Sequence, residues 1–374
     1  MNAFETGAPR LGDGRVGDVA SLTQFANDAL PSLRRASGLM CFDRPRDVPL
    51  LRGESVRYSI MVLLGLLRRS RTGGDVAIDP NELHRQIHAH REGLGVGDLG
   101  LLLWADVRMG APTARSTLAA LDRRSANTGL GRLEGMEIAW LVLGAVEAQV
   151  GGLPATAVLD RAVTNLYHRG SRTTPLLRHD ERGHWRSRLP NFATEIYSLL
   201  AFSELARHDL ASGAQRRAVR LADVLIDLRQ PDGGWPWLFH ADSGVVVERY
   251  EIYSVHQDAM APMAFFALAE VTGDEAYARA AVEGFQWCLG KNELAFDFYE
   301  AGERFAHRSI RRRGAVARRG NLLANSVLAV SGRRPSVDRG GLEINTTCRP
   351  YHLGWILEAW SGRDSMSALK GATA

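Results

Sequence analysis

A short stretch of the chain, residues 248–258, concentrates side chains that can move protons. It reads Glu-Arg-Tyr-Glu-Ile-Tyr-Ser-Val-His-Gln-Asp, with two glutamates, an aspartate, two tyrosines and a histidine. Two carboxyl groups can divide into an acid and a base when their surroundings separate their pKa values. We therefore predict Glu251 and Asp258 as the acid/base pair, with Tyr253 and His256 assisting proton transfer. A solvated polar loop is the alternative that the residues leave open.

Pro262 determines the local structure that we expect here. Proline cannot donate the helical hydrogen bond to the carbonyl group of Asp258. We therefore expect an ordered loop over residues 248–258, followed by a helix that begins near residues 259–262. Loops at the end of a rigid scaffold commonly carry binding and catalytic residues.

Two tryptophans precede this stretch, in Gln230-Pro-Asp-Gly-Gly-Trp-Pro-Trp237. Asp-Gly-Gly after a proline predicts a tight turn, and the fixed φ of Pro236 restricts the backbone between the two rings. We expect Trp235 and Trp237 to stack on a sugar, with at least one of them bordering a central cavity. Packing of both rings in the core is the alternative. The residues predicted to line the same binding site are Asp232, Tyr250 and Glu248.

Polar and aromatic residues also open several otherwise apolar helices, which begin near Glu54, Glu137, Glu195 and Tyr351. Carboxylates at such positions are costly to bury without a purpose. Further residues of this kind are Arg57, Tyr58, Trp140, Tyr197 and His352. We predict Arg57, Tyr58, Glu195 and His352 as substrate-binding residues. Either Arg57 or Arg312 is expected to hold a substrate carboxylate through a bidentate pair. Helix capping and pairing with arginine are the alternatives.

Helical periodicity predicts the elements that position these residues, in pieces of roughly 10 to 18 residues. Some predicted helices are amphipathic and rich in arginine, such as 214–226, whereas others are apolar almost all round and must be buried. These two types predict an inner ring wrapped by outer helices. We therefore expect an all-α fold, an α/α toroid of five to six helical hairpins, with a small β-hairpin excursion at 244–250. A solenoid or a pair of helical bundles is the structural alternative.

The predicted toroid defines the domain organisation. We expect an N-terminal extension with a first helix over residues 1–50, the toroid over residues 51–362 and a flexible C-terminal tail over residues 363–374.

The composition of the chain argues against nucleic acid and membrane as binding partners. The 374 residues carry 46 basic and 42 acidic side chains, a net charge of +4, and show no basic surface interleaved with aromatics that would predict nucleic-acid binding. No apolar run approaches the ~20 residues that a membrane span needs. The three cysteines lack the spacing of a disulfide framework. We expect a cytoplasmic protein without membrane insertion; the oligomeric state stays open.

Other chemistries lack their motifs. The chain has no phosphate-binding P-loop, no HExxH and no nucleophile elbow, and the GxGxxG at residues 95–100 follows no predicted strand. His84 and His88 have the i, i+4 spacing of a chelating pair, but no convincing third ligand is near them in the sequence. We therefore expect no metal and no cofactor.

The residues already described carry a family resemblance. Gln230-Pro-Asp-Gly-Gly-Trp235 resembles the Gln-to-DGGW repeat of terpenoid cyclase and protein prenyltransferase toroids. The rest of the pattern is similar to the six-hairpin glycosidase-like α/α toroids, which include unsaturated glucuronyl hydrolases and sugar epimerases. Residues 250–264 also resemble uncharacterised bacterial toroid proteins associated with surface polysaccharides. The chain lacks the DxDD acid motif and the Asp/Cys/His zinc set of the terpenoid enzymes, so a terpenoid-cyclase-like activity ranks third.

The resemblance and the carboxylates together favour carbohydrate chemistry. We predict a carbohydrate-active enzyme of the glycoside hydrolase, lyase or epimerase type that acts on an acidic or polysaccharide-derived sugar. The alternative is a non-catalytic toroid that binds a glycan or a partner protein in exopolysaccharide assembly. The sequence leaves the substrate and the bond acted on open.

Overall fold

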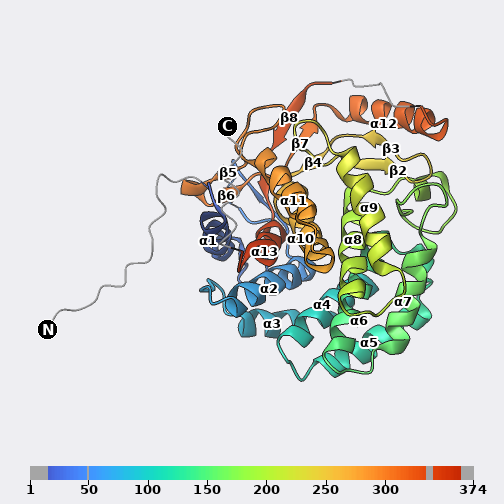
Figure 1. Cartoon of the computed structure of the whole chain (residues 1–374). Helices are drawn as coiled ribbons and strands as arrows, with labels where there is room; N and C mark the ends of the chain where they lie inside the picture. The colour runs from blue at the N-terminus through green and yellow to red at the C-terminus, as the bar shows by residue number, and fades with distance from the viewer. Residues whose placement is uncertain (1–15, 49, 334–339, 364–374) are drawn as a thin grey trace.

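The computed structural model describes residues 16–48, 50–333 and 340–363, and within these ranges the chain forms a closed ring of helices (Figure 1). Neighbouring inner helices pack on one another around the whole ring. In order they are α2 (Val56–Arg71), α4 (Val96–Arg108), α6 (Gly135–Val150), α8 (Phe192–Arg207), α10 (Ala261–Thr272) and α13 (Pro350–Trp360).

One outer helix packs on each inner helix. In the same order the outer helices are α3 (Pro80–Ala89), α5 (Ala114–Asn127), α7 (Thr156–His168), α9 (Ala214–Leu228), α11 (Glu275–Cys288) and α1 (Val19–Ala29). The first helix of the chain thus completes the hairpin of the last one. The predicted α/α toroid is confirmed, with six hairpins in the described part of the chain. Helix α1, assigned by sequence to an N-terminal extension, belongs to the ring.

The two predicted types of helix occupy the two layers. Helix α6 is buried on all sides along most of its length, whereas α9 buries one face, formed by Ala214, Ala218, Leu221, Ala222 and Leu225. Side-chain caps help to fix where inner helices begin: Ser55 accepts from the amide of Tyr58, and Asn191 from the amide of Thr194. The inner helices expected near Glu54, Glu137, Glu195 and Tyr351 therefore begin within a few residues of those positions.

Glycines let inner helices approach backbone to backbone. A Cβ atom added at Gly65 of α2 would lie 2.1 Å from the carbonyl oxygen of Gly354 in α13. A Cβ atom at Gly144 of α6 would lie equally close, 2.1 Å, to the carbonyl oxygen of Gly100 in α4. Gly100 belongs to the GxGxxG sequence, so this glycine serves helix packing rather than nucleotide binding.

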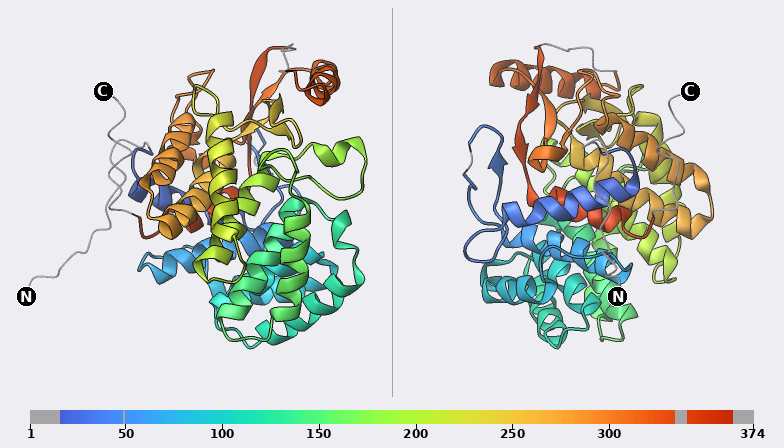
Figure 2. Two further views of the ribbon diagram at one scale, coloured as in Figure 1. Left: turned by 45° about the vertical axis from the view of Figure 1, so that its right-hand side comes forward. Right: turned by 90° about the vertical axis from the view of Figure 1, so that its left-hand side faces the viewer.

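Short antiparallel strands lie at one end of the ring, together with α12 (Ala315–Val330) (Figure 2). The predicted hairpin is present as β2 (Leu238–His240) and β3 (Val245–Glu248). The remaining pairings join distant segments, except that β5 and β6 are close in the chain. They are the three-stranded sheet of β4 (Ile252–Tyr253), β7 (Ser309–Arg312) and β8 (Leu342–Asn345), the pair β1 (Arg44–Pro45) with β9 (Thr347–Cys348), and the pair β5 (Tyr299–Glu300) with β6 (Phe305–Ala306).

The expectation of one loop over residues 248–258 was wrong. This segment contains the end of β3, all of β4 and the start of a helix that runs into α10. The helix passes through a π-helical turn at His256–Met260, where the amide of Ala261 bonds to the carbonyl of His256. Pro262 then occupies the first turn of α10, where a missing amide hydrogen is tolerated.

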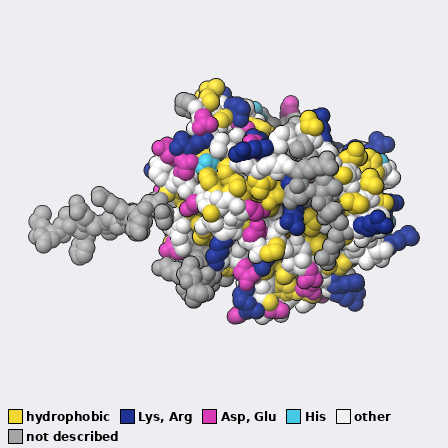
Figure 3. Space-filling view, turned by 90° about the horizontal axis from the view of Figure 1, so that it is seen from above, with side chains coloured by type: hydrophobic (Ala, Val, Ile, Leu, Met, Phe, Trp, Pro, Cys, Tyr) yellow, Lys and Arg dark blue, Asp and Glu magenta, His cyan; other side chains and the backbone are white. Residues whose placement is uncertain are grey.

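The outer surface shows no segregation of charge on the face seen in Figure 3, where basic and acidic side chains both occur. No helix in the described ranges is long and apolar enough to span a bilayer. Of the predicted C-terminal tail, only Arg363 belongs to the described residues.

The close contact at Gly65 generates a first prediction. Gly65→Ala should lower the free energy of unfolding by about 3 kcal/mol in urea titrations, because the added methyl group must force α2 and α13 apart. Gly320→Ala is the matched control: this glycine lies in α12 with open space around its Cβ position, so alanine should stabilise the protein by up to about 1 kcal/mol. Equal stability of Gly65→Ala and wild type would contradict the packing described above.

Candidate active site

Residues from the starts of four inner helices contact one another at one end of the ring, which we call the amino mouth. Arg57 of α2 forms an ion pair with Asp98 of α4, and its guanidinium lies 5.2 Å from the ring centroid of Trp140 in α6. Trp140 in turn packs edge-on against Tyr197 of α8, with 5.3 Å between ring centroids. Burial opposes the charge of Arg57, but the carboxylates of Asp98 and Glu137 outweigh it and raise its pKa.

An aromatic stack joins the first and last inner helices at the same mouth. The ring of Tyr58 lies between those of Tyr351 and Phe42, with centroid distances of 4.6 and 5.5 Å. The guanidinium of Arg349 covers Phe42 at 4.2 Å and donates a hydrogen bond of 2.5 Å to the Tyr58 hydroxyl. Its Nε atom is buried and has no partner among the described residues. Such an unpaired donor is suited to a ligand.

His256 lies in the π-helical turn that precedes α10. Its ring is nearly parallel to that of Trp237, with 6.0 Å between centroids, and contacts Phe192 and Tyr253 at 5.0 Å each. Burial, together with the positive charge of Arg308 and the nearness of His352, lowers the pKa of His256 to about 3. The ring is therefore neutral near pH 7, and its buried Nδ1 atom has no partner within the described ranges.

His352 is held by a buried carboxylate. Its Nε2 atom lies 2.7 and 2.8 Å from the two carboxylate oxygens of Asp258, which is fully buried. Asp258 also accepts hydrogen bonds from the hydroxyl of Tyr299, at 2.8 Å, and from the thiol of Cys288, at 3.4 Å. A carboxylate behind an imidazole fixes the ring and stabilises its protonated form. His352 can therefore accept a proton, whereas Asp258 is enclosed by its donors.

Glu251, the other predicted carboxylate, lies at the mouth with its charge balanced. It accepts hydrogen bonds from Asn345, at 2.9 Å, from Ser309 and from the hydroxyl of Tyr253, at 3.2 Å. The guanidinium of Arg308 lies 4.0 Å from Glu251 and covers the ring of Tyr253 at 4.9 Å. Burial, followed by the charge of Glu251, raises the pKa of Tyr253 above its ordinary value.

The structure brings together half of the predicted site residues. Those at the amino mouth are Arg57, Tyr58, Trp237, Glu251, Tyr253, His256 and His352, with Asp258 directly behind His352. Their predicted catalytic or binding roles stay predictions.

Several other predicted residues occupy positions that differ from those expected. Trp235 is fully buried between the rings of Phe192 and Phe265, so it offers no face to a sugar. Arg312 and Glu248 form a buried ion pair of 3.1 Å, which places the Arg312 guanidinium over Tyr250 rather than at the mouth.

The remaining two predicted residues have local structural contacts. Glu195 is fully buried and accepts a hydrogen bond of 3.1 Å from the amide of Leu177; burial raises its pKa well above the ordinary value. Asp232 accepts from the amide of Gly234 at 2.9 Å and so closes the Asp-Gly-Gly turn.

The sequence reasoning missed Asp98, Arg308 and Arg349 as residues of the mouth. Asp98 lies in the first turn of α4, so it is a polar residue at the start of an apolar helix, the same pattern that identified Glu137 in α6. Arg308 belongs to the arginine-rich stretch 308–319, whose density is a sequence signal for a solvated loop or an anion-binding group, whereas no sequence signal identifies Arg349, because its partners come from distant segments.

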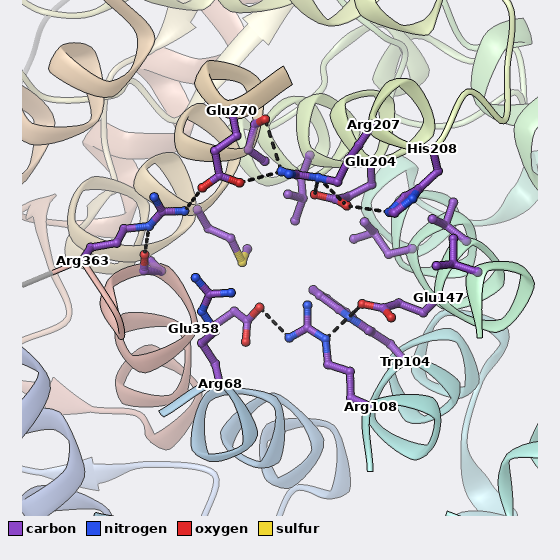
Figure 4. A pocket seen from close by; sticks show the side chains of 17 residues that line it. Arg68, Trp104, Arg108, Glu147, Glu204, Arg207, His208, Glu270, Glu358 and Arg363 are labelled. Carbon is purple, nitrogen blue, oxygen red and sulfur yellow. Dashed lines mark hydrogen bonds and ion pairs between the residues drawn. The ribbon is translucent and has the colours of Figure 1, made fainter. Parts of the chain in front are cut away.

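The opposite end of the ring, the carboxyl mouth, holds a cavity of about 260 Å³ (Figure 4). Arg108 bridges Glu147 and Glu358 at 3.0 and 2.7 Å. In the same way Arg207 bridges Glu204 and Glu270, at 3.2 and 2.8 Å. Each of these four carboxylates is thus neutralised by an arginine, and all the pairs except Arg207–Glu204, which lies within α8, connect different inner helices. The unpaired nitrogen atoms and the supported histidine make the amino mouth the better candidate for catalysis.

Comparisons with known proteins identify the fold. No protein-family model and no curated protein match the chain. Among solved structures, the cellobiose 2-epimerase of Bacillus thermoamylovorans B4167 is 11% identical over 92% of this chain and 99% of its own, with a TM-score of 0.64. An unsaturated glucuronyl hydrolase specific for heparin is 14% identical over 93% and 96%, with a TM-score of 0.63. A sugar epimerase from a ruminal bacterium is 13% identical over 92% and 98%, with a TM-score of 0.61. The likeness confirms the six-hairpin glycosidase-like α/α toroid as the fold.

The neutral state of His256 generates a second prediction. Its pKa is about 3 in the folded chain and 6.5 in the absence of folding, so below pH 6.5 only the unfolded chain takes up this proton. The contribution of the neutral His256 to the free energy of unfolding is therefore fully present above about pH 6.5 and falls as the pH decreases towards 3. Between about pH 7.5 and pH 5, the free energy of unfolding measured in urea titrations should fall by about 2 kcal/mol more in wild type than in His256→Gln.

The exposed His90 provides the control for this measurement. His90→Gln should reproduce the wild-type dependence on pH. If His256→Gln does so as well, His256 is not kept neutral by its surroundings.

Proposed function

We propose that the protein is a carbohydrate-active enzyme that removes a proton from the carbon next to a carbonyl or carboxylate group of an acidic sugar, as an epimerase or a lyase does. The observation that carries this proposal is the pair of histidines at the amino mouth. His352 is supported by the buried Asp258, and His256 is neutral with an unpaired nitrogen atom. The two rings are close enough for His352 to contribute to the lowered pKa of His256.

In this reaction His352 is the base, because Asp258 stabilises the imidazolium that forms. As the C–H bond breaks, its electrons form a carbon–carbon double bond and the carbonyl oxygen takes the negative charge. The guanidinium of Arg57, about one third exposed at the mouth, is suited to stabilise that oxygen. In an epimerisation, the neutral His256 relays a proton from water to the opposite face of the carbon, taking one up at one ring nitrogen as it releases the proton on the other. In an elimination, the same relay delivers a proton from water to the leaving oxygen on the next carbon.

The surroundings of the histidines favour an acidic sugar. Arg308 and Arg349 each carry a buried Nε atom without a hydrogen-bond partner among the described residues, and guanidinium groups bind carboxylates well. The rings of Trp237 and Tyr58 are half-buried and can cover the apolar face of a sugar. Among the similar structures, the name of the glucuronyl hydrolase agrees with an acidic sugar, and the names of the two sugar epimerases agree with the proposed type of reaction.

A specific observation favours hydrolysis as a second candidate. Asp98 and Glu137 open the neighbouring helices α4 and α6, and both act on the charge of Arg57. A pair of carboxyl groups beside a bound sugar is the usual equipment of a glycoside hydrolase. The amino mouth is too rich in charged groups to favour a terpenoid cyclase, and a non-catalytic glycan-binding toroid stays the other alternative.

Exchange of protons with solvent tests the proposal. The protein is incubated in D₂O with a panel of reducing sugars and uronate-containing oligosaccharides. Proton NMR then follows deuterium incorporation and new epimers, and ultraviolet absorbance follows new conjugated double bonds. We expect His352→Asn and His256→Asn each to lower turnover by at least about 100-fold, because each removes a proton-transfer group.

Controls separate the candidates. His90→Asn, on the outer surface, should retain full turnover. Turnover that survives both histidine changes but is lost in Asp98→Asn would replace proton abstraction with hydrolysis. Binding of the sugars without any turnover would favour the non-catalytic toroid.

A further inference from the structure

Three side chains with metal-binding atoms meet between the outer helix α3 and the inner helix α4. His84 and His88 lie one turn apart on α3, and their Nε2 atoms lie 2.6 and 2.9 Å from the same oxygen, Oδ1 of Asp106. One ligand atom from each residue falls within 4.8 Å of the others. Asp106 is the third ligand that the sequence did not reveal, because it lies 18 residues after His88 on the next helix.

The carboxylate is held in position by a further hydrogen bond. Asp106 is fully buried, and its second oxygen, Oδ2, accepts a hydrogen bond of 2.6 Å from the hydroxyl of Thr117 in α5. Its Oδ1 atom is thereby directed towards the two histidines. Orientation of a ligand by a second layer of hydrogen bonds is typical of metal sites.

We propose that His84, His88 and Asp106 bind a divalent transition-metal ion, zinc by preference, with water as the fourth ligand. Two imidazole nitrogens and one carboxylate oxygen are a common donor set for four-coordinate zinc. Calcium and magnesium are disfavoured because they require six or more ligands, nearly all of them oxygen. The side chains of His84 and His88 are 11% and 12% exposed, so water can reach the open position.

The site lies apart from the amino mouth. Asp106 follows Asp98 by eight residues along α4, a helical rise of about 12 Å. A bound ion would connect α3 to α4 and, through Thr117, to α5. It would thereby link the hairpin of α2 and α3 to the hairpin of α4 and α5. Its role is therefore to stabilise the fold, and the proposal is independent of the proposed reaction.

Metal binding requires a change of tautomer but no redox step. In the metal-free cluster, Nε2 of His88 donates its proton to Asp106, while Nδ1 accepts a hydrogen bond of 3.2 Å from the exposed Arg91. To bind a metal through Nε2, the neutral ring must carry its proton on Nδ1 instead. The Arg91 guanidinium would then face another donor, the N–H at Nδ1 of His88, and so it must turn away. Arg91→Ala should therefore strengthen metal binding.

The experiment uses the full chain without a polyhistidine tag, freed of metal by a chelator. Zinc titration by calorimetry should show one ion per chain, and binding should raise the melting temperature. Cobalt(II) should give the visible absorption bands of a tetrahedral site, a test that needs no variant. His88→Gln should weaken zinc binding at least tenfold, Arg91→Ala should strengthen it, and His90→Gln, the adjacent exposed control, should leave it unchanged.

Other outcomes overturn the proposal. Wild type that binds neither zinc nor cobalt stoichiometrically, or His88→Gln with wild-type affinity, would leave the three side chains as a hydrogen-bonded cluster only. Circular dichroism of each variant shows whether it folds. Loss of metal binding in a folded His88→Gln variant then supports the site.

Discussion

The backbone contact between α2 and α13 at Gly65 and Gly354 closes the ring, and the arrangement of both mouths depends on it. At the amino mouth, this closure brings Tyr58 against Tyr351, which come from the two ends of the chain. At the carboxyl mouth, Glu358 of α13 comes within reach of Arg108 in α4. A side chain larger than hydrogen at the contact would separate these groups. The glycines therefore support the site without touching it.

The two mouths differ in electrostatics. Helix carboxyl ends carry partial negative charge, and at the carboxyl mouth arginines in the last turns, such as Arg108 and Arg207, balance both those ends and the glutamates. Helix amino ends carry partial positive charge, and at the amino mouth Arg308 and Arg349 add to it. An anionic sugar is thus attracted to the mouth that also holds the histidines.

Local patterns of the sequence were sufficient to predict the ring. The all-round apolar pattern of α6 and the single buried face of α9 follow from the spacing of apolar residues along each segment. Caps such as Ser55 and Asn191 act within one helical turn, so the starts of the inner helices were also predictable. Because polar residues open these helices, the sequence also predicted that these residues gather at one end of the ring.

The sequence by itself thus determined the toroid, the inner helices and much of the membership of the amino mouth. Only the tertiary structure decided which groups face one another. Asp258 supports His352, 94 residues away, instead of standing beside Glu251 as a second acid. Trp235 is enclosed by the core, and Asp106 joins two histidines of another helix. The physical reason is that burial and hydrogen-bond partners depend on contacts between distant segments, whereas helix periodicity and capping depend on neighbours in the chain.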